Sequence, residues 1–401
     1  MEQYAQMKSS GVSWIQDVPS DWGIRVLFQL VDQVKNKNKD LAEQNLLSLS
    51  YGKIKRKDIN NPEGLLPESF DGYNIIEADD IVLRLTDLQN DHTSLRVGQA
   101  KERGIITSAY TTLRPSSLVN PQYLYYVMHA YDLIKGFYGM GSGVRQGLNF
   151  DEVKTIKVPF PSINEQKEIV AYLDEQVEQI DSIIEEARST VEEYKKWKQS
   201  IVFETVTKGL AKDVDFRDSG EYWIGDIPSV WGMRKVKHIV KIENGSDPKT
   251  DGSIPVYGSG TGSFKTCGEF KEGPAVLLGR KGTVSIPRYI EGKYWNVDTA
   301  FNAYATTSSL NLKYFYYVAM CFDYPAYTSK TTLPSMTQSI YNNIRIPYPD
   351  KGEQDEIVRY LDERIQEIDS FLEEKISLQE DLEIYKRSLI YETVTGKRKV
   401  V

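Results

Sequence analysis

The sequence predicts an α+β protein built as a pseudo-two-fold tandem repeat, in which two mixed α/β domains are joined by two long antiparallel coiled-coil helices. Three observations support this prediction. A motif with two tryptophans occurs twice, a long charged segment occurs twice, and the stretches between them mix strand and helix patterns. The 401 residues are enough for more than one domain with its own core.

The repeat has two conserved elements. WIQDVPSDWG (14–23) returns as WIGDIPSVWG (223–232) with seven of ten positions identical. VPFPSINEQKEIVAYLDEQVEQIDSIIEE (158–186) matches IPYPDKGEQDEIVRYLDERIQEIDSFLEE (346–374) at 16 of 29 positions, and both charged segments end in ETVT. The offsets of 209 and 188 residues are far too long for a solenoid and indicate a duplicated domain pair.

The charged segments have the apolar spacing of coiled-coil helices. Apolar residues recur at intervals of four and three residues and are expected to pack between the helices: Leu173, Val177, Ile180 and Ile184, then Leu361, Ile365, Ile368 and Leu372. A helix from about 164 to 207 would be roughly 66 Å long and could not bury its apolar stripe alone. We expect the second copy to pack against it in the antiparallel direction.

Four successive regions follow from this pattern. We predict a first mixed domain at 1–157, a first spacer helix at 158–210, a linker with the second mixed domain at 211–345, and a second spacer helix at 346–401.

Within the mixed domains, apolar runs broken by glycine and proline predict strands, as in GPAVLLGRKGTVSIP and YWNVDTAFNAYAT. Near the end of each domain, YLYYVM (123–128) and YFYYVAM (314–320) predict helices. Asn120 and Asn311, three residues ahead of them, are the expected N-caps.

The net charge of −8 is unevenly distributed along the chain. Residues 158–218 carry 8 basic and 14 acidic side chains, and residues 346–401 carry 9 and 14. By contrast, residues 32–157 carry 16 of each sign, and residues 241–345 carry 11 basic and 8 acidic. The acidic helices would repel phosphate, so we expect them to face proteins and the mixed domains to face any nucleic acid.

Other classes of protein are disfavoured by composition. Two cysteines and three scattered histidines form neither a disulfide framework nor a zinc pattern. We find no run of about 18 apolar residues and no signal peptide, so we expect a cytoplasmic protein without a membrane partner.

The paired Trp-Ile-x-Asp-x-Pro-Ser-x-Trp-Gly motifs, the Pro-aromatic-Pro…Glu-Gln starts of the helices and the ETVT endings resemble the specificity subunit of type I restriction–modification systems. The resemblance covers essentially the whole chain, and the two-copy order is its specific part. It implies a DNA-recognition subunit without catalysis of its own, carrying two target recognition domains that each recognise half of a split, asymmetric site on double-stranded DNA.

The resemblance also implies partners. Two methyltransferase subunits would dock on the helices, and restriction and translocase subunits would complete the enzyme. No cofactor is expected in this chain, whereas S-adenosylmethionine, ATP and Mg²⁺ are expected on the partner subunits. A self-contained methyltransferase or nuclease, and a coiled-coil interaction protein without a DNA role, remain alternatives.

Candidate DNA-contacting residues lie in loops and basic runs. GSGVRQGLNF (141–150) carries Arg145 and Gln146, and its counterpart SKTTLPSMTQSIY (329–341) carries Lys330, Ser335 and Gln338. The other candidates are Arg280 and Lys281 in GRKGT, and the basic run Lys53, Lys55, Arg56 and Lys57. Arginine suits guanine, glutamine suits adenine, and either cation suits phosphate. An ordinary flexible loop, a plain hairpin turn and a solvated face are the respective alternatives.

Several motifs favour a structural interpretation. The four repeated tryptophans are expected to hold each domain against the helices, since large aromatic residues are mostly buried. GSGTGS (258–263) lacks the spacing of a dinucleotide or phosphate loop and predicts a turn. NPQY (120–123) is explained by a capping asparagine followed by proline in the first helical turn. The C-terminal GKRKVV is expected to be a loose basic tail.

Overall fold

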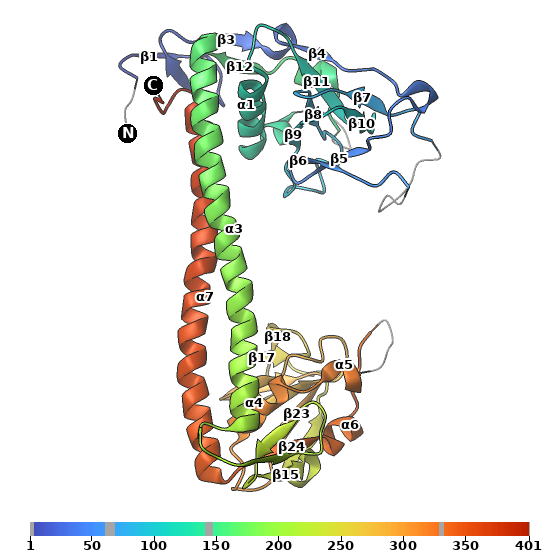
Figure 1. Cartoon of the computed structure of the whole chain (residues 1–401), viewed down its shortest axis with the longest axis vertical. Helices are drawn as coiled ribbons and strands as arrows, with labels where there is room; N and C mark the ends of the chain where they lie inside the picture. The colour runs from blue at the N-terminus through green and yellow to red at the C-terminus, as the bar shows by residue number, and fades with distance from the viewer. Residues whose placement is uncertain (1–3, 61–68, 141–146, 329–332, 401) are drawn as a thin grey trace. The chain divides into compact units, whose positions relative to one another are not determined.

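The computed structural model describes residues 4–60, 69–140, 147–328 and 333–400 (Figure 1). The chain divides into two compact units. The first unit comprises residues 1–187 and 377–401, and the second comprises residues 188–376. The helices α3 (Ile163–Lys208) and α7 (Lys351–Val394) each contribute one stretch to both units.

The first unit is mixed α/β. Its helices besides α3 and α7 are α1 (Pro121–Leu133) and α2 (Phe150–Val153). Its strands are β1 (Met7–Ser9), β2 (Asp17–Pro19), β3 (Gly23–Val26), β4 (Val31–Gln33), β5 (Leu47–Ser50), β6 (Lys53–Arg56), β7 (Asn74–Ile76), β8 (Ile81–Leu83), β9 (Val97–Gln99), β10 (Gly104–Ile106), β11 (Thr111–Pro115) and β12 (Lys157–Phe160).

The second unit is also mixed. Its shorter helices are α4 (Leu312–Met320), α5 (Tyr324–Tyr327) and α6 (Gln338–Asn343). Its strands are β13 (Phe216–Asp218), β14 (Asp226–Pro228), β15 (Gly232–Lys235), β16 (Val240–Asn244), β17 (Ile254–Tyr257), β18 (Ser263–Cys267), β19 (Lys271–Glu272), β20 (Ala275–Gly279), β21 (Arg288–Ile290), β22 (Lys293–Asn296), β23 (Ala300–Ala305) and β24 (Arg345–Tyr348).

Both units contain the same set of strand pairings, which we call the shared frame. Its central sheet is antiparallel and has the order β4-β11-β8-β9 in the first unit and β16-β23-β20-β21 in the second. The pairs β1–β2 and β3–β12 correspond to β13–β14 and β15–β24. The remaining sheets differ: β5–β6 and β7–β10 in the first unit, and β18-β17-β22-β19 in the second.

The predicted helix near the end of each domain is confirmed, and so is its cap. The side chain of Asn120 accepts a hydrogen bond from Tyr123 N at 3.0 Å, with Pro121 in the first turn of α1. Asn311 caps α4 in the same way, accepting from Lys313 N at 2.9 Å. These caps satisfy backbone donors that a helix start leaves unpaired.

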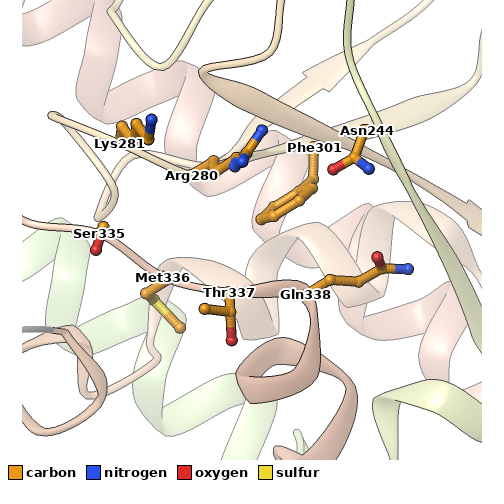
Figure 2. Close-up of a pocket in the computed structure, with 8 residues that line it drawn as sticks. All are labelled: Asn244, Arg280, Lys281, Phe301, Ser335, Met336, Thr337 and Gln338. Atoms are coloured by element: carbon orange, nitrogen blue, oxygen red, sulfur yellow. The ribbon is translucent and has the colours of Figure 1, made fainter.

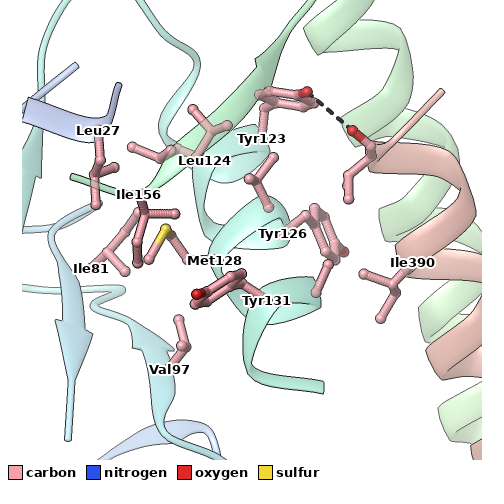
Figure 3. Close-up of a cluster of buried hydrophobic side chains, with 14 of the residues drawn as sticks. Leu27, Ile81, Val97, Tyr123, Leu124, Tyr126, Met128, Tyr131, Ile156 and Ile390 are labelled. Carbon is pink, nitrogen blue, oxygen red and sulfur yellow. Dashed lines mark hydrogen bonds between the residues drawn. The ribbon is translucent and has the colours of Figure 1, made fainter. Parts of the chain in front are cut away.

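The core of the first unit forms around α1 (Figure 3). Tyr123 and Met128 on α1 are buried together with Ile81 and Val97 of the central sheet, and Ile390 of α7 belongs to the same cluster. The helix therefore packs between the sheet and the long helices. Burying side chains of this size stabilises the fold by about 1.5–3 kcal/mol each.

In the first unit, the starting half of α3 lies against the final part of α7. Leu173, Ile180 and Ile184 are buried in the same cluster as Ile390 of α7, and Val177 is partly buried beside them. These are the apolar positions expected to pack between the helices.

In the second unit, the directions are reversed, so the two helices are antiparallel. Leu361 is buried and Ile365 partly buried in the main cluster of that unit. Ile368 and Leu372 of α7 are buried in a smaller cluster with Val191 of α3.

One ion pair in each unit links the two helices. Lys386 Nζ lies 2.7 Å from Asp181 Oδ1 in the first unit, and Lys198 Nζ lies 2.6 Å from Asp369 Oδ1 in the second. Each pair joins equivalent positions of the repeat, because both members differ by 188 residues from their counterparts.

A tyrosine in each unit connects three parts of the shared frame. Tyr123 Oη is 3.2 Å from the carbonyl oxygen of Pro159 and 3.5 Å from that of Val394, the contact dashed in Figure 3. Tyr314 Oη is 3.2 Å from the carbonyl oxygen of Pro347 and 3.3 Å from that of Val206. The ETVT end of each long helix therefore belongs to the unit that the other copy begins.

The glutamine of each Glu-Gln motif is fully buried and positions the capping asparagine. Gln166 Oε1 accepts a hydrogen bond from Asn120 N, and Gln354 Oε1 accepts one from Asn311 N, both at 2.8 Å. The amide nitrogens donate to the carbonyl groups that precede each long helix. The motif therefore ties the start of the long helix to the helix of the domain.

The repeated tryptophans have the structural role expected of them. Trp22 and Trp231 are buried. The indole nitrogen of Trp231 donates to Glu353 Oε2 of α7 at 2.8 Å. Gly396, at φ 72°, ends the chain's second long helix against Trp22, where a Cβ atom would collide with Pro19. Glycine is therefore required at this helix end.

The expectation of a loose C-terminal tail is wrong for residues 396–398. Lys397 Nζ donates to the carbonyl oxygen of Ile15 at 2.5 Å, and burial lowers the pKa of Lys397. Arg398 is largely buried and pairs with Glu392 at 3.0 Å. The tail closes the first unit because its cations find carbonyl and carboxylate partners there.

Candidate DNA interface

Two loops of the second unit that are more than 50 residues apart pair through their backbones. Gly282 N donates to the carbonyl oxygen of Pro334 at 2.9 Å, and Met336 N donates to that of Arg280 at 3.0 Å. Lys281 and Ser335 form an antiparallel bridge between the loops. The GRKGT turn and the loop before α6, predicted as separate candidates, therefore form one surface.

This surface lines a pocket of about 280 Å³ (Figure 2). The turn contributes Arg280 and Lys281 to one side, and the loop contributes Ser335–Gln338 to the other. Asn244 and Phe301 come from β16 and β23 of the central sheet. The pocket thus combines cations, amides and hydroxyls on a rigid sheet edge, the mixture that suits contacts with bases and phosphates.

The guanidinium of Arg280 is held in place. Its central carbon lies 6.0 Å from the centroid of the Phe301 ring. Its Nη1 lies 3.3 Å from the carbonyl oxygen of Asp298 and 3.8 Å from a carboxylate oxygen of that residue. An arginine has five N–H donors in a fixed fork, so others remain for an external acceptor. Its orientation is set before any ligand binds.

Gln338 has a structural commitment that the sequence did not reveal. Its Nε2 donates to the carbonyl oxygen of Ile242 at 2.6 Å, which fastens the loop to β16. The neighbouring Thr337 caps α6 by accepting from Ile340 N at 3.2 Å. Gln338 would have to give up this bond to pair with adenine through both amide atoms. Lys330 lies outside the described residues.

The segment GSGTGS connects β17 to β18, as the predicted turn requires, and it also adjoins this surface. Ser259 Oγ donates to the carbonyl oxygen of Lys281 at 2.6 Å. Arg288 Nη2 donates to the carbonyl oxygen of Gly260 at 2.6 Å, with its guanidinium over the Tyr257 ring. No local pattern identifies this neighbourhood, because it arises from contacts between distant strands.

In the first unit, the basic run occupies the second strand of the hairpin β5–β6 and the position after it. Lys53 and Lys55 are exposed. Arg56 forms an ion pair with Glu102, so its charge is partly matched within the unit. Lys57 directly follows the strand. Arg145 and Gln146 lie outside the described residues.

Two ionisable residues of α1 are buried rather than placed on a surface. Asp132 Oδ2 accepts a hydrogen bond from Arg96 N at 2.6 Å, and burial raises the pKa of Asp132 to about 6. Burial lowers the pKa of His129 to about 4, with a smaller contribution from the positive charges of Lys386 and Arg387. Both belong to the core of the first unit, so they take no part in the candidate interface.

Among the residues that the structure describes, no helix is both long and apolar enough to cross a membrane. The same residues contain no group of three or more His, Cys, Asp or Glu side chains arranged to hold a metal ion.

Comparison with known proteins gives consistent matches. The family model described as "Type I restriction modification DNA specificity domain" matches residues 19–193 and 228–379. The type I restriction enzyme MjaVIII specificity subunit of Methanocaldococcus jannaschii is 22% identical over 416 residues, covering 96% of this chain and 94% of that protein.

Two solved structures share the fold. A chain from a structure on complex assembly and conformational transition of the type I R-M system has a TM-score of 0.70 at 14% identity, covering 94% of this chain and 98% of that chain. The HsdS subunit from Thermoanaerobacter tengcongensis has a TM-score of 0.51 at 14% identity, covering 95% and 98%. At this identity, the likeness concerns the fold alone.

Proposed function

The chain belongs to the family of the type I restriction modification DNA specificity domain, and we propose that the mixed domain of each unit recognises one half of a split DNA site. The family assignment makes the chain the non-catalytic, DNA-recognising subunit of a type I restriction–modification system. The proposal concerns which surfaces contact DNA and which contact the partner subunits.

One observation supports this division most strongly. The shared frame repeats its central sheet, its strand pairs and its tyrosine and glutamine contacts in both units, whereas the remaining sheets differ. A subunit that recognises two different half-sites needs the same attachments twice and two different contact surfaces. The divergent sheets and loops are therefore the parts that we assign to DNA.

In the second domain, we assign the pocket around Arg280 to DNA contact. The held guanidinium suits the O6 and N7 acceptors of guanine, and Lys281, which is exposed, suits a phosphate oxygen. Residues 241–345 carry 11 basic and 8 acidic side chains, so the local charge favours DNA although the whole chain is acidic.

Exchange of one domain tests the division. Residues 31–155 lie between β3 and β12 of the frame and can be replaced by the equivalent segment of a relative with another target. In a cell that also supplies the partner methyltransferase, the map of methylated adenines should change in one half of the recognised site only. A change in both halves would contradict the assignment of one domain to each half-site.

We assign partner docking to apolar patches on the paired helices. In the second unit, Tyr194 stacks on Phe371 with ring centroids 4.4 Å apart, and Trp197 packs edge-on against Tyr194 at 5.5 Å. Trp197 is 52% exposed, which is unusual for so large an aromatic residue on an acidic helix. Aromatic residues of this kind are enriched where proteins bind each other.

The repeat places a second apolar patch at equivalent positions in the first unit. Leu382, Tyr385 and Ile183 differ by 188 residues from Tyr194, Trp197 and Phe371. Tyr385 and Ile183 are both exposed. Two equivalent patches support the docking of two copies of one partner, the methyltransferase subunit, and restriction subunits would join that assembly. S-adenosylmethionine, ATP and Mg²⁺ then belong to the partners.

The mass of the purified complex tests the docking. With the wild-type chain, we expect two methyltransferase copies per specificity subunit. Trp197→Asp or Tyr385→Asp should each leave one copy, and the double variant should leave none. Leu118→Asp, at an exposed position away from both long helices, is the control and should retain two. Two copies retained by the double variant would exclude these patches.

A further inference from the structure

The hairpin β5–β6 of the first unit carries an aromatic residue at its tip that the fold does not use. Tyr51 is 77% exposed. Within the described residues, its side chain makes no hydrogen bond, ion pair or ring contact. The residue lies between β5 and β6, outside the shared frame and inside the part of the first unit that differs from the second.

The backbone at Tyr51 is also unfavourable for its side chain. Tyr51 has φ 48° and Gly52 has φ 76°. Two successive positive φ values are the signature of a type I′ turn, in which asparagine followed by glycine is preferred. A bulky residue in the left-handed region is an outlier that points to a functional constraint. The sequence therefore keeps a large ring where asparagine would fit better.

The hairpin is firmly seated on the domain. Leu47, Leu49 and Ile54 point inward and pack in one cluster with Val82 and other residues of the sheet. Behind the tip, a Cβ atom on Gly52 would already lie 3.0 Å from Leu95 Cβ. The tip is thus a fixed projection.

The outward face of the hairpin is polar and basic. Ser48 pairs with Lys55 and Ser50 pairs with Lys53, so all four side chains point away from the packed face. Lys53 and Lys55 are exposed. The segment from 46 to 57 contains four cations and no acidic residue. This charge favours a polyanion over a protein partner of either sign.

We propose that this hairpin enters the major groove of the first half-site, with Tyr51 against the base edges and Lys53 and Lys55 on the flanking phosphates. The major groove is about 12 Å wide and admits a two-stranded β-ribbon. The inference rests on the proposed function, because it assumes that the first domain contacts DNA. It goes further by naming one ribbon and one side chain that determine specificity.

The test uses the full chain with its methyltransferase partner and compares methylation of plasmid DNA. Tyr51→Asn removes the ring and suits the turn, so the variant should melt at or above the wild-type temperature. Its methylation rate should fall at least about tenfold, or its motif should become degenerate in one half only. Tyr51→Phe keeps the ring and should retain the motif. Phe28→Asn, at another exposed aromatic position of the same unit, is the matched control and should retain motif and rate.

Binding measured against salt concentration provides a second readout. Replacing Lys53 and Lys55 together by serine should reduce the slope of log affinity against log salt by about two, because two phosphate contacts are lost. A wild-type rate and motif for Tyr51→Asn, or an unchanged slope for the serine variant, would overturn the inference. If the wild-type chain itself directs no split motif, the proposed function fails instead, and the two failures are distinguishable.

Discussion

At the scale of single residues, His129 and Asp132 show how burial affects the first unit. Both lie on α1, one helical turn apart, and their pKa values move in opposite directions, to about 4 and about 6. Between roughly pH 6.5 and 4, the unfolded chain takes up a proton at His129 while the folded chain does not, so stability is lost as the pH falls. Over the same window, Asp132 takes up its proton first in the folded chain, so stability is gained. The two effects offset each other.

Removing one member should expose the other. For His129→Gln, the variant no longer loses stability through this site as the pH falls. The stability advantage of the wild type over the variant should therefore shrink by about 2 kcal/mol between pH 6.5 and 4.5. Thermal unfolding midpoints of both proteins at the two pH values measure this change. An identical difference at both pH values would show that His129 titrates normally in the folded chain.

At the scale of elements, the buried tyrosine hydroxyls hold the helix ends. Tyr123→Phe and Tyr314→Phe each remove a donor shared by two carbonyl groups, so each should cost about 1–2 kcal/mol in its own unit. Hydrogen exchange should accelerate at residues 391–395 in the first variant and at residues 203–207 in the second. Tyr51→Phe, which removes an exposed hydroxyl, should change neither segment.

How much of these elements the sequence predicts depends on the range of the contacts. The long helices and the capping asparagines follow from spacings of three or four residues, and the structure confirms both. The role of Gln166 and Gln354 is different, because their partners are 46 and 43 residues away. The repeat marks these glutamines as special, but no local pattern identifies what they bind.

The candidate interface was harder to predict for the same reason. Arg280 and Ser335 are each recognisable as loop residues with suitable chemistry, yet their pairing depends on how the whole second unit folds. Asn244 has no distinguishing signal, since it simply ends a strand. Arg56 looks like its basic neighbours, but Glu102 pairs with it from a distant loop.

At the scale of the whole molecule, the chain combines duplication with divergence. Each unit is completed by a helix end from the other copy, through Val394 in the first unit and Val206 in the second. Neither half of the sequence therefore contains a complete unit. Such an arrangement keeps both frames constant while the intervening sheets differ, as expected of a subunit that recognises two unlike half-sites with one construction.

The measurement that tests this most directly is a map of methylated adenines in the source cell with the gene intact and deleted. We predict that one split motif, two short defined blocks around an unspecified gap, loses its methylation on deletion and regains it when the gene is restored. An unchanged methylation map, in a cell whose partner methyltransferase is expressed and active, would contradict DNA recognition by this chain.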